Sequence, residues 1–149
     1  MLRQLEGLAR FAHLLLQLFL GFIFVMHGAQ KFFGPSFYGL PWERYVGIFN
    51  SVGLVPGRFW LSVVVVTELI GGFCIFFGCL TRFWAAGLVI DMTVAVTWVH
   101  IPVGFFWQVR PPGGFEFPMT LGVIALAMFL MGPSFLSLDR AIGLEKRAA

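Results

Sequence analysis

The chain has 149 residues, of which 59% are apolar and only 11% are charged. Soluble domains carry about 45–50% apolar and about 25% charged residues, and a domain of this size cannot bury such an excess of apolar side chains. The composition therefore excludes an ordinary soluble domain and requires an outer surface that faces the lipid bilayer. The net charge of +3 does not indicate nucleic-acid binding, because the basic residues are scattered at segment ends and form no patch.

Four apolar segments are long enough to cross a bilayer as helices, which takes about 20 residues. They are residues 11–33, 59–81, 83–101 and 117–138. The backbone has to satisfy its own hydrogen bonds in lipid, which favours helices over strands. The first segment exceeds the roughly 7–15 apolar residues of a signal peptide and no small-x-small cleavage site follows it, so we expect it to remain as a helix. The predicted fold is all-α: a polytopic membrane protein forming one domain, residues 1–149, as a four-transmembrane-helix up-and-down bundle.

The connections between the segments differ in length. In the longest, residues 35–57, Trp42, Tyr45, Val46 and Phe49 recur at helical spacing, which fits either a short helix in the membrane interface or an ordinary covered loop. The third segment ends before Pro102. After it, residues 103–114 are rich in proline and glycine and are predicted to be irregular.

The basic residues predict the orientation of the bundle in the membrane. Six lie on the side that holds both termini: Arg3, Arg10, Arg82, Arg140, Lys146 and Arg147. Four lie on the other side: Lys31, Arg44, Arg58 and Arg110. The positive-inside rule then places both termini in the cytoplasm.

Cys74 and Cys79 both fall in the second segment. On a continuous helix they are about 140° and about 7.5 Å apart, which is poor geometry for a disulfide. No CxxC motif is present, so the sequence favours small packing residues over a thiol relay.

Ionisable side chains at membrane depth are the strongest functional signal. With a rise of 1.5 Å per residue, Glu68 and Asp91 lie near the middle of their segments, whereas His27, Lys31 and His100 lie about 7–13 Å towards the outer side. A carboxylate at the bilayer centre costs about 2.5–3.5 kcal/mol. We therefore expect both carboxylates to face the bundle interior, a wet cavity or another subunit.

The first segment carries one inward stripe at three- and four-residue spacing: His13, Gln17, Leu20, Phe24, His27 and Lys31. Glu68 is the expected partner of His27 and Lys31. With His100 and Glu116 at its mouth, this cluster predicts a polar pocket open to the outer side. Such a cluster fits a functional site, although the same pairs can act as structural glue between helices.

Asp91 fits this pocket less well. On a regular helix it lies half a turn away from His100 and shares its face with Trp84 and Trp98. The face of Trp84, Asp91 and Trp98 is expected to contact another helix or a partner protein. Haem and metal binding are not expected, because His27 and His100 differ in depth by about 5 Å and no metal-ligand pattern appears.

Several motifs in register with the four segments resemble those of the DoxX family. They are "HGAQKFFG", "FNSVGLVPG", "ELIGGFCIFFGCLTR", "DMTVAV", His100 followed by "GFF", "GFEFP" and "GPSFLSLDR". Their order and spacing match the family over roughly residues 14–140. One departure is Ser134, where the family more often has glycine. The resemblance implies a small four-helix bacterial inner-membrane protein associated with redox or thiol-stress complexes. The family's recurrent polar positions correspond here to His27, Lys31, Glu68, Arg82, Asp91, His100 and Glu116.

Two functions fit these features. In the first, the chain is a subunit of a quinone-linked oxidoreductase: a quinone enters the outer pocket, His27 or Lys31 holds a carbonyl, and Glu68 carries a proton. Electrons then come from a partner protein. In the second, the chain is a non-catalytic accessory subunit that contacts other membrane subunits or copies of itself. A transporter is a third reading, but four helices without an inverted repeat are unsuited to act alone.

Overall fold

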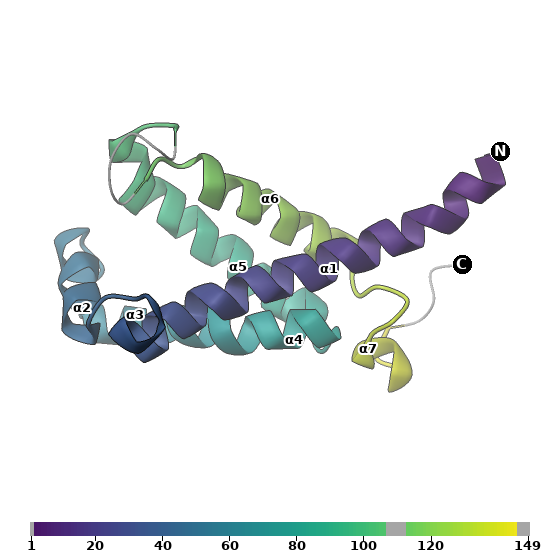
Figure 1. Ribbon diagram of the computed structural model, residues 1–149, viewed down its shortest axis with the longest axis horizontal. Coiled ribbons are helices and arrows are strands. Elements are labelled where there is room, and N and C mark those ends of the chain that lie inside the picture. The colour runs from purple at the N-terminus through teal and green to yellow at the C-terminus, as the bar shows by residue number, and fades with distance from the viewer. Residues whose placement is uncertain (1, 107–112, 146–149) are drawn as a thin grey trace.

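The computed structural model describes residues 2–106 and 113–145, and within them it is an all-α membrane bundle without strands (Figure 1). Its longer helices are α1 (Leu2–Phe33), α2 (Trp42–Ser51), α3 (Gly57–Val65), α4 (Gly71–Phe77), α5 (Thr81–Val94) and α6 (Glu116–Met131), followed by the single turn α7 (Leu138–Ala141). Four short segments of other helix types join them: η1 (Gly34–Phe37), η2 (Val66–Ile70), η3 (Ala95–His100) and η4 (Ile101–Val103).

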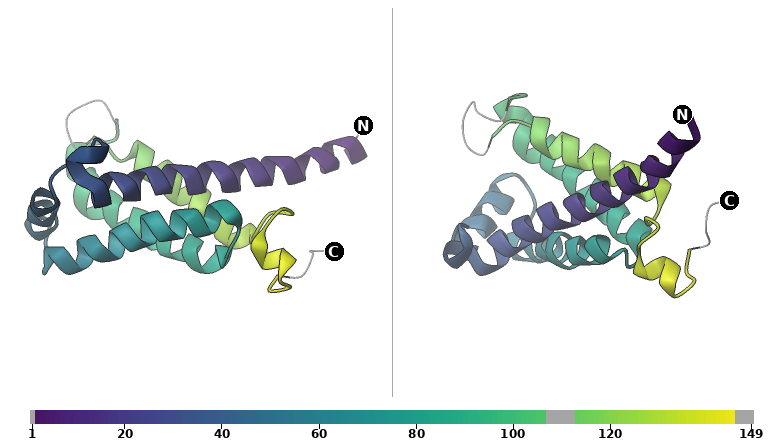
Figure 2. Two further views of the ribbon diagram at one scale, coloured as in Figure 1. Left: turned by 60° about the horizontal axis from the view of Figure 1, so that its bottom comes forward. Right: turned by 45° about the vertical axis from the view of Figure 1, so that its right-hand side comes forward.

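Three continuous helical stretches are long and apolar enough to cross a membrane: Gly7–Phe37, Gly57–Phe77 and Thr81–Val103. The fourth, α6, has 16 residues. The helix α1 packs along α4, and α5 packs along α6. At 32 residues, α1 is about 48 Å long, so its N-terminal part extends beyond the other helices (Figures 1 and 2).

The core of the bundle lies where these helices cross. Leu20, Phe24, Ile75 and Leu88 are almost fully buried in it. The predicted inward stripe of α1 is confirmed in its middle part, since Gln17 has no exposed surface. Burial of these apolar side chains against one another holds the helices in register.

Small residues allow α1 to approach both α4 and the preceding segment η2 closely. A Cβ at Gly21 would lie 2.6 Å from the backbone nitrogen of Phe76, and one at Gly28 would lie 2.4 Å from that of Leu69. No side chain fits at such distances, so the backbones themselves are in contact.

Two predicted helix ends were wrong. The second helix ends at Phe77 instead of residue 81, because Gly78 adopts the left-handed conformation with φ 67°. The fourth ends at Met131 instead of residue 138, because Gly132 has φ 74° and Pro133 follows it. Arg110, Lys146, Arg147 and the middle of the 103–114 connection lie outside the described residues.

The connection after α1 contains the predicted short helix, α2. Its Val46 forms a buried cluster with Leu61 and Val65 of α3, and Trp42, Tyr45 and Phe49 pack against that cluster. The apolar face of α2 is therefore covered by α3, so α2 is packed at the end of the bundle opposite the two chain termini (Figure 1).

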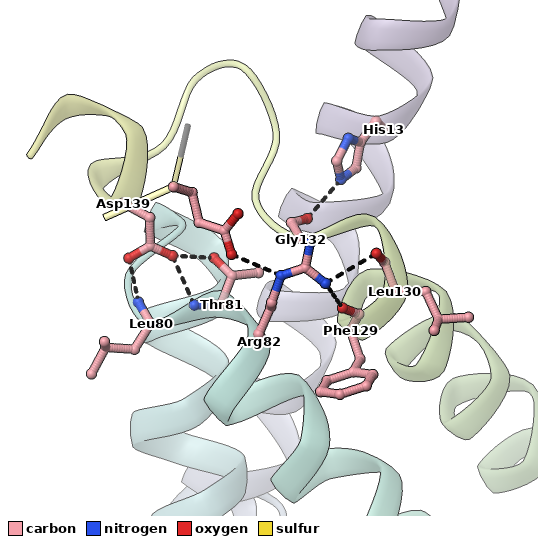
Figure 3. Close-up of polar contacts among 9 residues, drawn as sticks. His13, Leu80, Thr81, Arg82, Phe129, Leu130, Gly132 and Asp139 are labelled. Carbon is pink, nitrogen blue, oxygen red and sulfur yellow. Dashed lines mark hydrogen bonds and ion pairs between the residues drawn. The ribbon is translucent and has the colours of Figure 1, made fainter. Parts of the chain in front are cut away.

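At the opposite end, the segment after α6 caps the neighbouring helices (Figure 3). The carboxylate of Asp139 accepts hydrogen bonds from the backbone nitrogens of Leu80 and Thr81, at 2.6 and 2.9 Å, and from the Thr81 hydroxyl at 2.9 Å. It thereby satisfies donors at the start of α5, as a helix N-cap does.

Arg82 caps the C-terminal end of α6 by donating hydrogen bonds to its carbonyl groups. Its guanidinium donates to the carbonyls of Phe129 and Leu130 and pairs with Glu145 at 2.7 Å. His13 of α1 joins the same region through a 3.0 Å hydrogen bond with the carbonyl oxygen of Gly132. The two turns at this end of the bundle, 78–80 and 132–137, are thus held together by polar contacts.

Candidate functional site

A cavity of about 560 Å³ lies between α1, α2, the second transmembrane stretch and the third. Most of the side chains that line it are aromatic or aliphatic. The lining includes Phe24, Tyr45, Phe49, Trp60, Trp98 and Phe117, together with the polar residues His27, Gln30, Lys31, Thr67, Glu68, Asp91 and His100. Most ligand pockets have this size and this pattern of few polar groups in an apolar wall.

The ion pair between Lys31 and Glu68 is the main polar contact of the cavity. Lys31 Nζ of α1 lies 2.5 Å from Glu68 Oε2 of η2, and their side chains are 18% and 5% exposed. The predicted pairing of these residues is therefore present in the structure. His27, one turn before Lys31, lines the same cavity, which brings together the three residues that the sequence assigns to proton and carbonyl chemistry.

Asp91 lines this cavity too, which the sequence analysis did not expect. Its Oδ2 atom is buried and has no hydrogen-bond partner among the described residues. Most buried polar atoms in proteins are hydrogen-bonded. An unsatisfied carboxylate oxygen beside a cavity is therefore a position where a ligand can supply the missing partner.

Two wide helical turns explain why Asp91 and His100 share the cavity. The segments η2 and η3 are π-helical, and they contain Glu68 and His100 respectively. The prediction that Asp91 and His100 point to opposite sides assumed a regular α-helix. The π segment 95–100 changes the helical phase between them, and such segments occur frequently at functional sites.

His100 and Glu116 take different positions around the cavity. His100 Nδ1 is 2.7 Å from the carbonyl oxygen of Gly113, and this hydrogen bond fixes the position of the imidazole. Glu116 lines a second, shallower hollow of about 640 Å³ instead. His27 and Phe117 border both spaces, with ring centroids 5.8 Å apart. The predicted mouth is thus divided by this pair of rings.

The three residues expected to contact another helix or a partner protein, Trp84, Asp91 and Trp98, have different surroundings. Asp91 and Trp98 line the cavity, and Trp98 is also 50% exposed. Trp84 packs against the buried core, with its ring over Gly71 of α4. Of the three, Trp98 is the residue with substantial surface available to a partner.

Sequence reasoning missed the contribution of α2 to the site. Tyr45, Ile48 and Phe49 line the cavity, and the Tyr45 hydroxyl accepts a 3.1 Å hydrogen bond from the backbone nitrogen of Leu40. The helical spacing of the aromatic residues in 42–49 was the available signal, but it does not show which element they cover. No group of three or more His, Cys, Asp or Glu side chains in the described ranges is arranged to hold a metal ion.

Comparisons with known proteins agree with this architecture. The family model DoxX matches residues 12–101. An uncharacterized membrane protein of Mycobacterium tuberculosis is 32% identical over 142 residues, covering 89% of this chain and 81% of its own. A Bacillus subtilis protein named "Putative oxidoreductase CatD" is 32% identical over 126 residues, covering 85% and 83%.

A further relative, an uncharacterized protein of Haemophilus influenzae, is 32% identical over 129 residues, covering 87% of this chain and 82% of its own. No solved structure matches the chain. The family model spans more than half of the chain, and the polar cavity residues His27, Lys31, Glu68 and Asp91 lie within the motifs that carry the resemblance. The chain belongs to the DoxX family of membrane proteins.

Proposed function

We propose that this protein is an inner-membrane subunit of a quinone-linked redox system and that the 560 Å³ cavity is its quinone site. The observation that carries the proposal is the combination, in one membrane cavity, of aromatic walls, the Lys31–Glu68 pair and the unpartnered oxygen of Asp91. A quinone has a flat apolar ring and carbonyl acceptors on opposite sides, which requires walls and polar groups of these kinds.

The residues of the cavity fit this ligand. Lys31 and His27 are placed to donate hydrogen bonds to one carbonyl, and the Phe24 and Phe117 side chains supply apolar surface for the ring. Asp91, when protonated, is able to donate to a second oxygen. A bound quinone supplies two-electron chemistry coupled to the uptake of two protons.

Protons have to reach the cavity through ionisable side chains. Glu68 is 5% exposed on its side chain and is held by Lys31, so it is positioned to pass a proton between the cavity and its surroundings. Asp91 provides a second carboxylate for the second proton. Electrons reach the site from a partner protein.

Binding of a short-chain benzoquinone to the protein in lipid nanodiscs tests the proposal. Trp60 and Trp98 line the cavity, so saturable binding should quench tryptophan fluorescence. In Trp98→Phe the saturable part of the quenching should shrink. We expect Glu68→Gln to weaken binding by about tenfold or more, which corresponds to about 1.4 kcal/mol.

The matched control is Glu43→Gln. Glu43 pairs with Arg58 at 2.6 Å on the exposed outer surface, away from the cavity lining. The quinone affinity of Glu43→Gln should equal that of the unmodified protein. Non-saturable quenching, or equal affinities in the Glu68 and Glu43 variants, would overturn the proposed site. In a reconstituted complex, Glu68→Gln should also abolish quinone-dependent turnover.

An accessory role is the second candidate, and the exposed half of Trp98 favours it. In that case the Lys31–Glu68 pair joins helices and the protein acts by contacting other subunits. Purification in a mild detergent followed by mass spectrometry separates the two roles. A partner present at a fixed ratio, with no bound quinone, supports the accessory role, and a free homo-oligomer with bound quinone contradicts it.

A further inference from the structure

The turn between α4 and α5 brings the two cysteines of the chain together. Cys79 N donates to Cys74 O at 2.7 Å, Gly78 N donates to Ile75 O at 3.0 Å, and Gly78 has φ 67°. This is the Schellman motif, in which the side chains at the two ends of the six-residue turn come into contact. The separation expected for a continuous helix does not apply, because α4 ends at Phe77.

The side chains follow the backbone. The Cys74 thiol interacts with the Cys79 thiol and with the Trp84 indole. Both cysteines are free and partly exposed. A disulfide requires Cα atoms about 4.4–6.8 Å apart, and a turn closed by a 2.7 Å hydrogen bond between these two residues holds their backbones near one another.

The Trp84 indole provides an independent observation at the same place. Its Nε1 atom is buried without a hydrogen-bond partner among the described residues. The Trp84 ring packs over Gly71, one helical turn before Cys74, which sets the indole beside the Cys74 sulfur. A thiol is a weak acceptor, whereas a thiolate accepts a hydrogen bond more strongly. The indole N–H can therefore donate a hydrogen bond to the Cys74 sulfur when that thiol loses its proton to give the thiolate, which is the form that attacks disulfides.

We propose that Cys74 and Cys79 form a redox-active dithiol at the end of the bundle that holds the Asp139 and Arg82 contacts. Its substrate class is a low-molecular-weight disulfide. The thiolate of Cys74 attacks one sulfur of the small disulfide, breaks its S–S bond and releases one thiol. Cys79 then attacks the Cys74 sulfur of the mixed disulfide and releases the second thiol.

The reaction balances without a further oxidant. The protein loses two protons and two electrons as the Cys74–Cys79 disulfide forms, and the small disulfide gains them as two thiols. With this end of the bundle in the cytoplasm, as the basic residues predict, cellular thiols keep the pair reduced and the disulfide is transient. This activity is independent of the proposed quinone site, which lies towards the other end of the bundle.

The test treats the full-length protein in nanodiscs with oxidised glutathione and then labels free thiols with a maleimide mass tag. We expect the reduced protein to take two tags and the treated protein to take none, with mass spectrometry showing a disulfide within the 74–79 peptide. Dithiothreitol should restore both tags. In Cys74→Ser or Cys79→Ser, the remaining cysteine should instead retain a stable mixed disulfide with glutathione.

Trp84→Phe in the Cys79→Ser background tests the indole. If the indole hydrogen bond stabilises the Cys74 thiolate, this double variant should react with maleimide at Cys74 about fivefold more slowly than Cys79→Ser alone. Trp98→Phe in the same background should leave the rate of labelling at Cys74 unchanged. The proposal is overturned if the treated unmodified protein still takes two tags, if glutathione accumulates on both cysteines, or if disulfides form only between chains. The unmodified protein alone decides these outcomes, so poor folding of a variant does not affect them.

Discussion

Glu68 and Asp91 line one cavity from neighbouring helices, but among the described residues Glu68 forms an ion pair and Asp91 does not. Lys31 Nζ lies 2.5 Å from Glu68, whereas Asp91 Oδ2 is buried and unpartnered within the described part of the chain. The Glu68 carboxylate therefore has a charged partner. The Asp91 carboxylate departs from the rule that buried polar atoms are hydrogen-bonded, and its burial does not stabilise the fold. Their substitution should have opposite effects on stability.

Breaking the Lys31–Glu68 pair should destabilise the bundle unequally. Lys31→Met leaves the 5% exposed Glu68 side chain without its cation, which should cost about 3–5 kcal/mol. Glu68→Gln should cost less, because the long Lys31 side chain is 18% exposed and can extend towards the headgroups. Thermal unfolding in one detergent measures both variants.

Arg58→Met is the matched control for that comparison. Its pair with Glu43 has side chains that are 71% and 66% exposed, and such pairs contribute about 0–1 kcal/mol. Losses of similar size at the two pairs, or a larger loss from Glu68→Gln than from Lys31→Met, would contradict the role assigned to burial.

Replacing Asp91 by leucine should raise stability and impair the proposed site. The substitution removes a buried oxygen without a partner, a penalty of about 1–3 kcal/mol, and the adjoining cavity leaves room for the larger methyl groups of leucine. The unfolding midpoint should rise while the affinity for the short-chain benzoquinone falls. An Asp91→Leu protein that is less stable than the unmodified protein would show that the carboxylate is satisfied in a way that the structure does not reveal.

Substitution of Asp139 should have the reverse effect on stability. Asp139→Ala removes the acceptor of two backbone N–H groups and one hydroxyl, so unfolding should become easier by about 1–3 kcal/mol. Hydrogen exchange should show faster exchange at Leu80 and Thr81, while the amides of α6 keep their protection. Asp139→Asn retains an amide oxygen and should lie between the two proteins.

Close packing of α1 against η2 can be tested at one glycine. A Cβ at Gly28 would lie 2.4 Å from Leu69 N, in backbone contact next to Glu68, whereas a Cβ at Gly47 of α2 meets nothing within 4 Å. Gly28→Ala should therefore lower the unfolding midpoint and weaken quinone binding together. Gly47→Ala should be neutral or should stabilise by about 0.5–1 kcal/mol, because alanine is the better helix former. Equal behaviour of the two variants would rule out a backbone contact at Gly28.

The sequence predicted the parts of the fold that depend on hydropathy and on burial of charge. The lengths of the apolar segments predict the main helices. The free-energy cost of an isolated carboxylate in lipid predicts the contact between Lys31 and Glu68. Both properties depend on the transfer of a side chain from water to lipid. They can therefore be predicted without knowing the detailed path of the backbone.

The parts that could not be predicted depend on local departures from regular helix. The π segments at 66–70 and 95–100 have no pattern in the sequence, and they decide which residues face the cavity. The positive φ at Gly78 likewise brings Cys74 and Cys79 into one turn. A rotation of about 100° per residue, as in a regular α-helix, therefore predicts the wrong relative positions of Asp91 and His100 and of Cys74 and Cys79. Asp139 was overlooked for a different reason: its partners are 58 and 59 positions away.

The long sequence separation between Asp139 and the amides that it binds also affects the order in which the protein assembles during synthesis. The amides of Leu80 and Thr81 obtain their acceptor only from residue 139, which the ribosome adds after the rest of the bundle has been made. The hairpin of α1 and the 57–77 stretch can pair earlier, since its contacts lie within the first half of the chain. Assembly should therefore proceed from the N-terminal hairpin, and the start of α5 should become fixed only as translation finishes.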